Sequence, residues 1–177
     1  MQQFSQNYFQ LFGLPQSFSL DLDLLSLKYR ELQIEIHPDR FASASEEEKL
    51  KAVQLSSLLN QAYDTLQTPL KRAGYLLQLQ GLDLERVSQQ DLGMDLLMEQ
   101  MQLRETLDEL PMDESALEQL ERLKVEVTDK LATRQREFAT NIGNNELDAA
   151  KRGYHEMQFL QKLLQEIETG EERRLGY

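Results

Sequence analysis

Apolar side chains recur every three or four residues along most of the chain, which is the period of one face of an α-helix. Two such stripes flank a proline: Leu22, Leu25, Tyr29, Leu32 and Ile36 precede it, and Ala52, Leu55, Leu59, Ala62 and Leu66 follow it. Proline disfavours helical geometry in the residue before it, so the first helix should end near His37. The pattern therefore predicts two antiparallel helices joined by an exposed loop that carries His37, Pro38 and Asp39.

Residues that favour helix ends support these limits. Ser45 and three glutamates open the second helix, where acidic groups interact favourably with the helix dipole. The capping candidates for the first helix are Ser19, Asp21 and Asp23. Pro69 suits the first turn of a short third helix, and Gly81 suits its end. We therefore assign residues 1–80 to a first unit and residues 81–91 to a connector.

The remaining residues, 92–177, have the pattern of a three-helix bundle. The expected helices run from about residue 94 to 109, from 113 or 115 to 140, and from 146 to 168, with breaks at Pro111 and at residues 143–145. Their core stripes are Leu96, Leu103, Leu107 and Leu110; Leu120, Val127, Leu131 and Phe138; and Met157, Leu160, Leu164 and Ile167. Long helices with short connections most simply pack as an antiparallel bundle. The predicted fold is therefore all-α, with an N-terminal helical hairpin plus short helices and a C-terminal three-helix bundle.

The first helix of the bundle has more apolar side chains than one core stripe needs. At about 100° per residue, Leu97, Met98 and Met101 lie on the other side of this helix from its core stripe. Glutamates continue that side toward the helix end, and Phe159 of the third helix lies about 120° from its own stripe. We name this set the second apolar face: Leu97, Met98, Met101, Gln102, Glu105, Glu109 and Phe159. An apolar patch edged by carboxylates is typical of a recognition surface, although a helix that touches both of its neighbours would bury the same residues.

Composition and charge narrow the function. The chain has 177 residues, 40% of them hydrophobic, and no apolar run near the roughly 18 residues that span a membrane. Its first basic residue is Lys28, so the N-terminus resembles neither a secretory signal nor an Arg-rich transit peptide, and we expect a cytoplasmic protein. The net charge is −12, with 9 acidic and 7 basic residues in 1–80 and 22 acidic and 12 basic residues in 81–177. This acidity disfavours binding to nucleic acid.

Little in the sequence indicates catalysis. There are no cysteines, which excludes disulfides and thiolate metal ligands, and the two histidines are His37 and His155. No glycine-rich phosphate loop or nucleophile elbow is present. An enzyme built on the carboxylates of Glu105, Asp108 and Glu109 is a weaker alternative, because runs of carboxylates on helices are usually solvated. We therefore expect no enzymatic activity, no bound metal and no cofactor.

The order of residues around the His-Pro-Asp tripeptide resembles a J-domain, the module by which co-chaperones stimulate ATP hydrolysis by Hsp70. The matching segments are Tyr8-Phe9-Gln10-Leu11-Phe12-Gly13-Leu14, Tyr29-Arg30, His37-Pro38-Asp39-Arg40-Phe41 and Asn60-Gln61-Ala62-Tyr63-Asp64-Thr65-Leu66. The whole chain resembles the HscB-type J-protein dedicated to iron–sulfur cluster assembly, through residues 41–43, 69–77, 97–105 and 159–163. The resemblance implies a J-domain at residues 1–80 and a scaffold-binding bundle at 92–177, and we expect the two to form an L-shaped molecule.

The resemblance also implies two binding sites. An Hsp70 would contact Lys28, Arg30, His37, Pro38, Asp39 and Arg40, and an iron–sulfur scaffold protein of the IscU type would contact the second apolar face. Gln102 stands where the family has a glutamate, and Glu31 and Glu35 stand where generic J-domains often carry Lys or Arg. These two acidic residues favour a specialised Hsp70 of the HscA type over a general housekeeping chaperone. The expected function is stimulation of that ATPase and delivery of the scaffold for cluster transfer; a J-protein that serves a different client is the alternative.

Overall fold

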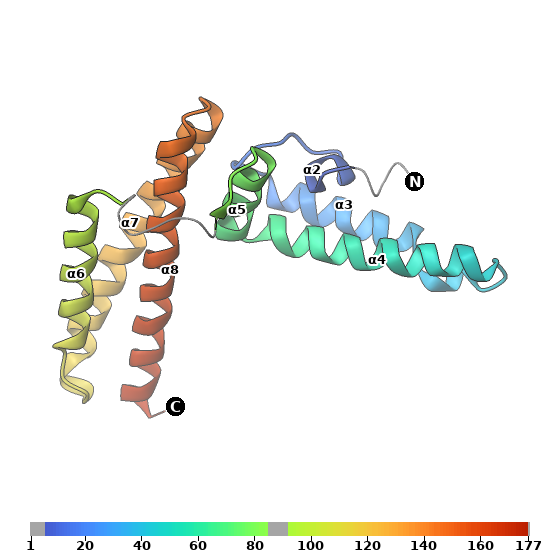
Figure 1. Cartoon of the computed structure of the whole chain (residues 1–177). Helices are drawn as coiled ribbons and strands as arrows, with labels where there is room; N and C mark the ends of the chain where they lie inside the picture. Colours follow the sequence, from blue (N-terminus) through green and yellow to red (C-terminus); the bar gives the residue numbers. More distant parts are fainter. Residues whose placement is uncertain (1–5, 85–91, 177) are drawn as a thin grey trace. The chain divides into compact units, whose positions relative to one another are not determined.

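The computed structural model describes residues 6–84 and 92–176, and every regular element within those ranges is helical (Figure 1). In chain order the elements are α2 (Tyr8–Leu11), α3 (Leu22–Glu35), η1 (Pro38–Phe41), α4 (Glu46–Gln67), α5 (Pro69–Leu79), α6 (Met94–Asp108), η4 (Glu114–Ala116), α7 (Leu117–Gly143) and α8 (Leu147–Leu175). No helix in these ranges has the length and apolar character needed to cross a membrane. The chain divides into two compact units between Leu76 and Leu77, inside α5. The predicted all-α fold of two units is confirmed, whereas residues 85–91 of the predicted connector lie outside the described residues.

The two long helices of the first unit are capped by their own side chains. Asp21 caps α3, since its Oδ1 accepts hydrogen bonds from the backbone N–H groups of Asp23 and Leu24, each 3.1 Å long. Ser45 caps α4, since its Oγ accepts a hydrogen bond of 3.2 Å from the N–H of Glu48. Such caps satisfy donors that have no partner within the first helical turn. Of the three candidates before α3, Asp21 is therefore the cap.

Helices α3 and α4 lie side by side as an antiparallel hairpin (Figure 1). The predicted stripes supply its core, which includes Leu25, Ala52, Leu59, Ala62 and Leu66. Aromatic stacking joins the two helices, because the rings of Tyr29 and Tyr63 have centroids 4.0 Å apart and the Tyr29 hydroxyl donates a 2.6 Å hydrogen bond to Asn60. Leu22 is an exception to its stripe and is 44% exposed at the first position of α3. The hydrophobic period therefore placed the hairpin interface correctly, except at that end.

A buried arginine attaches α5 to the hairpin. Arg72 is only 5% exposed, and its Nη1 donates a 2.9 Å hydrogen bond to the backbone carbonyl of Leu66 at the end of α4. Its guanidinium carbon lies 5.0 Å from the centre of the Phe18 ring, which is within the range of a cation–π interaction. Burial lowers the pKa of Arg72, because a desolvated guanidinium loses part of its hydration.

The core of the second unit lies mainly between α7 and α8, which pack against each other along their length (Figure 1). Its buried side chains include Leu120, Leu123, Val127, Leu131 and Phe138 from α7, and Tyr154, Met157, Leu160, Leu163 and Ile167 from α8. Leu163 is fully buried, whereas Leu164, which the predicted stripe includes, is half-buried. In α6 only Leu103 is buried, and the other three leucines of its predicted core stripe are half-buried. Helix α6 is therefore the most loosely buried of the three helices.

Helix α8 continues seven residues beyond the predicted end at Glu168, because an arginine near its C-terminus has a specific partner. The Nε and Nη2 atoms of Arg174 donate hydrogen bonds of 2.9 and 2.6 Å to the backbone carbonyl of Pro111, between α6 and α7. Its Nη1 donates to the carbonyl of Gly170, one turn earlier in α8. Gly176 then ends the helix with a positive φ of 81°, a conformation that glycine adopts without strain.

Arg72→Met should destabilise the first unit by about 2 kcal/mol, because it leaves the Leu66 carbonyl without its charged donor and removes the contact with Phe18. The measurement is hydrogen exchange of α4 peptides across a urea titration, which reports the first unit separately from the bundle. Lys71→Gln is the matched control: it breaks a 2.8 Å ion pair with Asp64 in which both side chains are more than half exposed. Such surface pairs contribute less than about 1 kcal/mol, so equal losses in the two variants would contradict the prediction.

Candidate functional site

The tripeptide His37, Pro38 and Asp39 forms a short turn that is held by its own hydrogen bonds. Pro38 begins η1, and the backbone N–H of Asp39 donates a 3.2 Å hydrogen bond to Nδ1 of His37. The N–H of Arg40 donates to the His37 carbonyl at 2.9 Å. The side chain of His37 is 59% exposed and that of Asp39 is 93% exposed, with 3.6 Å between Nδ1 and Oδ2. The imidazole therefore shapes the backbone, and the carboxylate remains in solvent.

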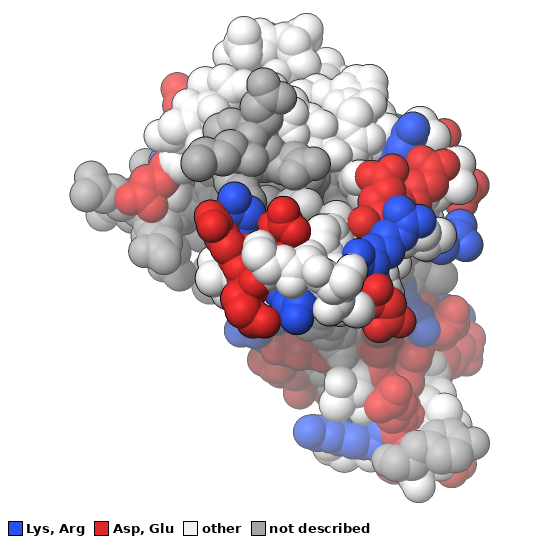
Figure 2. Space-filling view, turned by 90° about the vertical axis from the view of Figure 1, so that its right-hand side faces the viewer, with Lys and Arg blue, Asp and Glu red and all other residues white. Residues whose placement is uncertain are grey.

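Basic and apolar side chains surround this turn. Arg30, Gln33, Ile34, His37 and Arg40 line one open, shallow pocket, so α3 and η1 together bring three of the predicted Hsp70-binding residues to one place. Ile34 is 61% exposed there. Figure 2 views the molecule from the side on which α3 and α4 meet at the turn, and it shows charged side chains of both signs around uncharged surface. The surface is therefore mixed rather than uniformly basic.

Three predicted residues lie outside that pocket, and two residues in it were not predicted. Lys28 lies on α3 and pairs with Glu31 over 4.0 Å at the surface. Pro38 and Asp39 belong to the turn but do not line the pocket. Gln33 and Ile34 do line it. Ile34 could have been found in the sequence, since it is an isoleucine outside the core stripe of α3 and one turn from Arg30.

The second apolar face is largely accessible in the second unit. Met98 is 61% exposed and Met101 is 71% exposed, and together with Gln102 and Glu105 they line a shallow groove on α6. Asp95 and Glu99 complete the lining and were not predicted. The outer side of α6 is therefore apolar at its centre and carboxylate at its edges, which is the arrangement that the sequence analysis expected.

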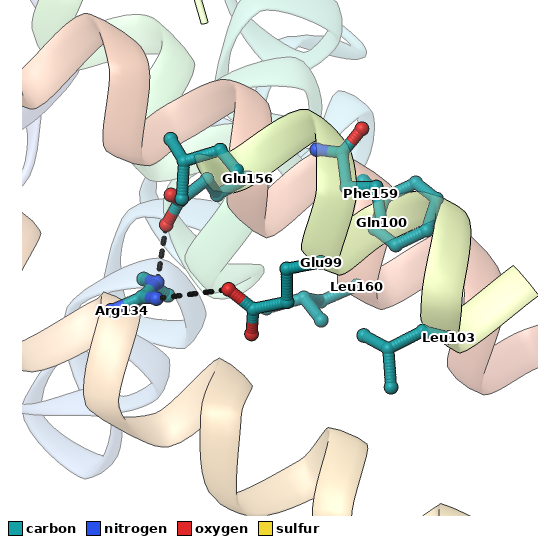
Figure 3. Close-up of a pocket in the computed structure, with 8 residues that line it drawn as sticks. Glu99, Gln100, Leu103, Arg134, Glu156, Phe159 and Leu160 are labelled. Atoms are coloured by element: carbon teal, nitrogen blue, oxygen red, sulfur yellow. Dashed lines mark ion pairs between the residues drawn. The ribbon is translucent and has the colours of Figure 1, made fainter. Parts of the chain in front are cut away.

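The other members of that face lie beside the groove rather than in it. Leu97 is half-buried, and Glu109 is exposed at the position that follows α6. Phe159 is half-buried and lines a separate pocket between α6, α7 and α8 (Figure 3). Leu96 and Leu103 line that pocket from α6. The structure thus divides the predicted scaffold-binding residues between an outer groove and the adjacent seam.

An ion-pair network centred on Arg134 of α7 joins the three helices at this seam. Figure 3 shows Arg134 between Glu156 of α8 and Glu99 of α6, with ion pairs to both. The Arg134–Glu99 distance is 3.7 Å, and Glu99 also pairs with Lys130. Glu137 contributes a further ion pair to Arg134 at 3.1 Å. Sequence reasoning missed the links to Glu99 and Glu156, because these residues lie on other helices and no local pattern relates them to Arg134.

Glu156 is the buried carboxylate of the network. Burial of this side chain raises the pKa of its carboxyl group, while the charge of Arg134 opposes that shift.

A second link between α6 and α8 is the ion pair of Arg104 with Glu166. Ion pairs therefore join α6 to both α7 and α8, beside the buried side chain of Leu103.

Metal binding has no evident location in the part of the chain that the structure describes. No group of three or more His, Asp or Glu side chains there is arranged to hold a metal ion. Both surfaces offer groups that bind a partner. The turn at His37 offers an exposed carboxylate near arginines, and the groove on α6 offers thioethers and carboxylates on one side of the helix.

Comparisons with known proteins place both units in one family of structures. The family model described as the HSCB C-terminal oligomerisation domain matches residues 92–168. The chaperone HscB from Vibrio cholerae has 39% sequence identity and a TM-score of 0.83, and the match covers 95% of this chain and 99% of that chain. The human co-chaperone protein HscB has 28% identity and a TM-score of 0.84 over 93% and 82% of the two chains. The Jac1 co-chaperone from Saccharomyces cerevisiae has 20% identity and a TM-score of 0.68 over 92% and 97%, which shows a shared fold.

Glu156→Gln should become more stable relative to the unmodified protein as the pH rises above the ordinary glutamate pKa of 4.5. The pKa of Glu156 is higher in the folded protein than in the unfolded chain, so its stabilising contribution is fully present below the unfolded value and is lost as the pH rises through the folded value. Glutamine does not titrate and cannot lose that contribution. Hydrogen exchange of α8 peptides at matched pH values measures the difference in opening free energy, and a difference that stays constant with pH would refute the assignment.

Proposed function

The chain belongs to the HscB family of J-type co-chaperones of iron–sulfur cluster assembly, and we propose that it connects a specialised Hsp70 to an iron–sulfur scaffold protein. The Hsp70 would be of the HscA type and the scaffold of the IscU type. One observation carries this proposal: each compact unit has its own accessible surface with the residues for one of the two partners. The protein would stimulate ATP hydrolysis through the first unit while the second unit holds the scaffold.

The turn at His37 supplies the contacts with the Hsp70. Its backbone is fixed by hydrogen bonds inside the turn, so Asp39 can bind a partner without first losing much conformational freedom. An arginine of the chaperone is the expected partner of the Asp39 carboxylate, since such pairs form strong charge-assisted hydrogen bonds. Arg30 and Arg40 would meet acidic groups of the chaperone, and Ile34 would add an apolar contact between them.

The groove on α6 supplies the contacts with the scaffold. Met98 and Met101 present flexible apolar side chains that adapt to an irregular partner, and Leu97 and Phe159 extend the apolar area at its side. Glu105 and Glu109 at the edge favour a basic surface on the scaffold. Gln102 reduces the negative charge of that edge by one relative to the family pattern.

The mechanism is delivery rather than chemistry by this chain. The iron–sulfur cluster is cargo that stays with the scaffold, and the protein brings the scaffold to the ATP-bound chaperone. Hydrolysis would then close the chaperone on the scaffold and promote cluster transfer. We place this activity in the cytoplasm and assign no enzymatic step and no cofactor to the chain itself.

Asp39→Asn should abolish ATPase stimulation while leaving helicity and scaffold affinity unchanged. Losing one partner of a desolvated charge pair costs about 2–5 kcal/mol, which corresponds to at least a tenfold weaker interaction with the chaperone. Single-turnover ATP hydrolysis by an HscA-type Hsp70 measures this. Asp23→Asn, an exposed aspartate in the first turn of α3, is the control and should stimulate normally. Normal stimulation by the Asp39 variant would remove the carboxylate from the mechanism.

Met98→Ala combined with Met101→Ala should weaken scaffold binding by about tenfold or more. Stimulation of ATP hydrolysis, measured without scaffold, should not change. Both side chains are exposed, so truncating them removes contact area without opening a cavity in the bundle. Titration calorimetry with an IscU-type scaffold measures the affinity. Met112→Ala changes a methionine that is 74% exposed and lies outside the second apolar face, and it should bind normally. Unchanged affinity in the double variant would exclude the groove as the scaffold site.

A further inference from the structure

The methionines of α6 form an exposed row on one side of the helix. Met94, Met98 and Met101 are spaced by four and three residues, which places them within about 60° around the helix axis. Their exposed fractions are 72%, 61% and 71%. Met157, in contrast, is 1% exposed in the core between α7 and α8. The chain therefore places readily accessible thioethers on the outer side of α6, whereas the thioether of Met157 is shielded from solvent.

Accessible thioethers react with peroxides in a simple two-electron step. Hydrogen peroxide transfers one oxygen atom to the methionine sulfur, so that a sulfur–oxygen bond forms, the peroxide O–O bond breaks and water leaves. The product is methionine sulfoxide, which methionine sulfoxide reductases convert back to methionine. The chain has no cysteine, so no thiol within it competes for the oxidant. Exposure decides which sulfur atoms react first.

We propose that Met98 and Met101 form a reversible, peroxide-sensitive modification site that weakens docking on the α6 groove when oxidised. This inference rests on the proposed function, since it assumes that the groove binds the scaffold. Oxidation turns a flexible apolar side chain into a polar one whose oxygen is a hydrogen-bond acceptor. An oxygen buried in the interface without a donor disfavours the complex.

The neighbours of these two methionines within this chain do little to relieve that penalty. Asp95, Glu99 and Glu105 line the same groove, and ionised carboxylates accept hydrogen bonds but cannot donate them. Only the amide of Gln102 offers side-chain N–H donors among the residues that line the groove. A sulfoxide oxygen would therefore add a further acceptor to a surface that already consists mainly of acceptors.

The same oxidation should leave the fold intact. Met98 and Met101 do not contribute to the core between α7 and α8, whereas Met157 does. Met112 provides an internal comparison, because it is 74% exposed and lies between α6 and η4, outside the groove. A loss of binding caused by oxidation of the groove can thus be separated from a general loss of structure.

The test treats the full-length protein alone with hydrogen peroxide, removes the peroxide, and maps sulfoxide at each methionine by peptide mass spectrometry. Calorimetry then measures the affinity for an IscU-type scaffold before treatment, after treatment and after incubation with methionine sulfoxide reductases. The variants are Met98→Leu with Met101→Leu, and Met112→Leu as the matched control. Each variant is compared with its own untreated sample, so that only the effect of oxidation is scored.

The proposal expects Met98 and Met101 to oxidise well ahead of Met157. After peroxide treatment, the protein without substitutions should bind the scaffold about tenfold more weakly, and the reductases should restore its affinity. After treatment, the double leucine variant should bind the scaffold with the same affinity as its untreated sample. The Met112→Leu variant should lose as much affinity as the protein without substitutions. Unchanged affinity at full oxidation of both residues would overturn the proposal, as would an equal loss in the double variant. Failure of the untreated protein to bind the scaffold at all would overturn the proposed function as well.

Discussion

The attachment of α6 to α7 and α8 is the constraint on which the functional half of the bundle depends. Helix α6 must attach to α7 and α8 on one side while the other side remains open to a partner. A broad apolar contact would bury within the bundle the leucines and methionines that a binding surface needs. Only Leu103 of α6 is buried, and Glu99 instead joins α6 to α7 through Lys130 and Arg134. Because charged contacts fix the helix at its edge, its apolar side chains remain available.

The first unit meets the same requirement through backbone hydrogen bonds. His37 caps the turn that it begins, and the turn holds its shape without using the Asp39 carboxylate for more than a loose contact with the imidazole. The aromatic stack of Tyr29 on Tyr63 joins the helices on either side of the turn. In both units, therefore, the surface keeps groups such as Asp39, Met98 and Met101 that do not position it, whereas His37 and Glu99 both position a surface and form part of it.

Hydrophobic period and capping residues were sufficient to predict the long helices and to group the residues of the second apolar face, because local spacing determines which side chains share a helix face; whether that face is accessible stayed open until the structure. It did not distinguish Leu163 from Leu164, since adjacent leucines differ by about 100° around the helix and only the packing of α7 decides between them. The extent of α8 depended on the hydrogen bonds from Arg174 to the Pro111 carbonyl, some sixty residues away. The same limit applies to the ion pairs that Arg134 forms with Glu99 and Glu156. Contacts between distant residues carry no signal in local spacing.

The structure separates the acidic residues of the second unit into two groups. Glu99 and Glu166 form ion pairs that link α6 to α7 and to α8, so their charges contribute to holding α6 in place, whereas Glu156 of α8 pairs with Arg134 of α7. Within the described residues, Glu105 and Glu109 take part in no such ion pair and lie exposed along the outer side of α6. Charges of the first kind are compensated inside the protein and add little to its long-range field. Charges of the second kind remain uncompensated in and beside the groove, where they can attract a basic partner and orient it before contact. Net charge alone would not have separated these two roles; the position of each carboxylate relative to the bundle does.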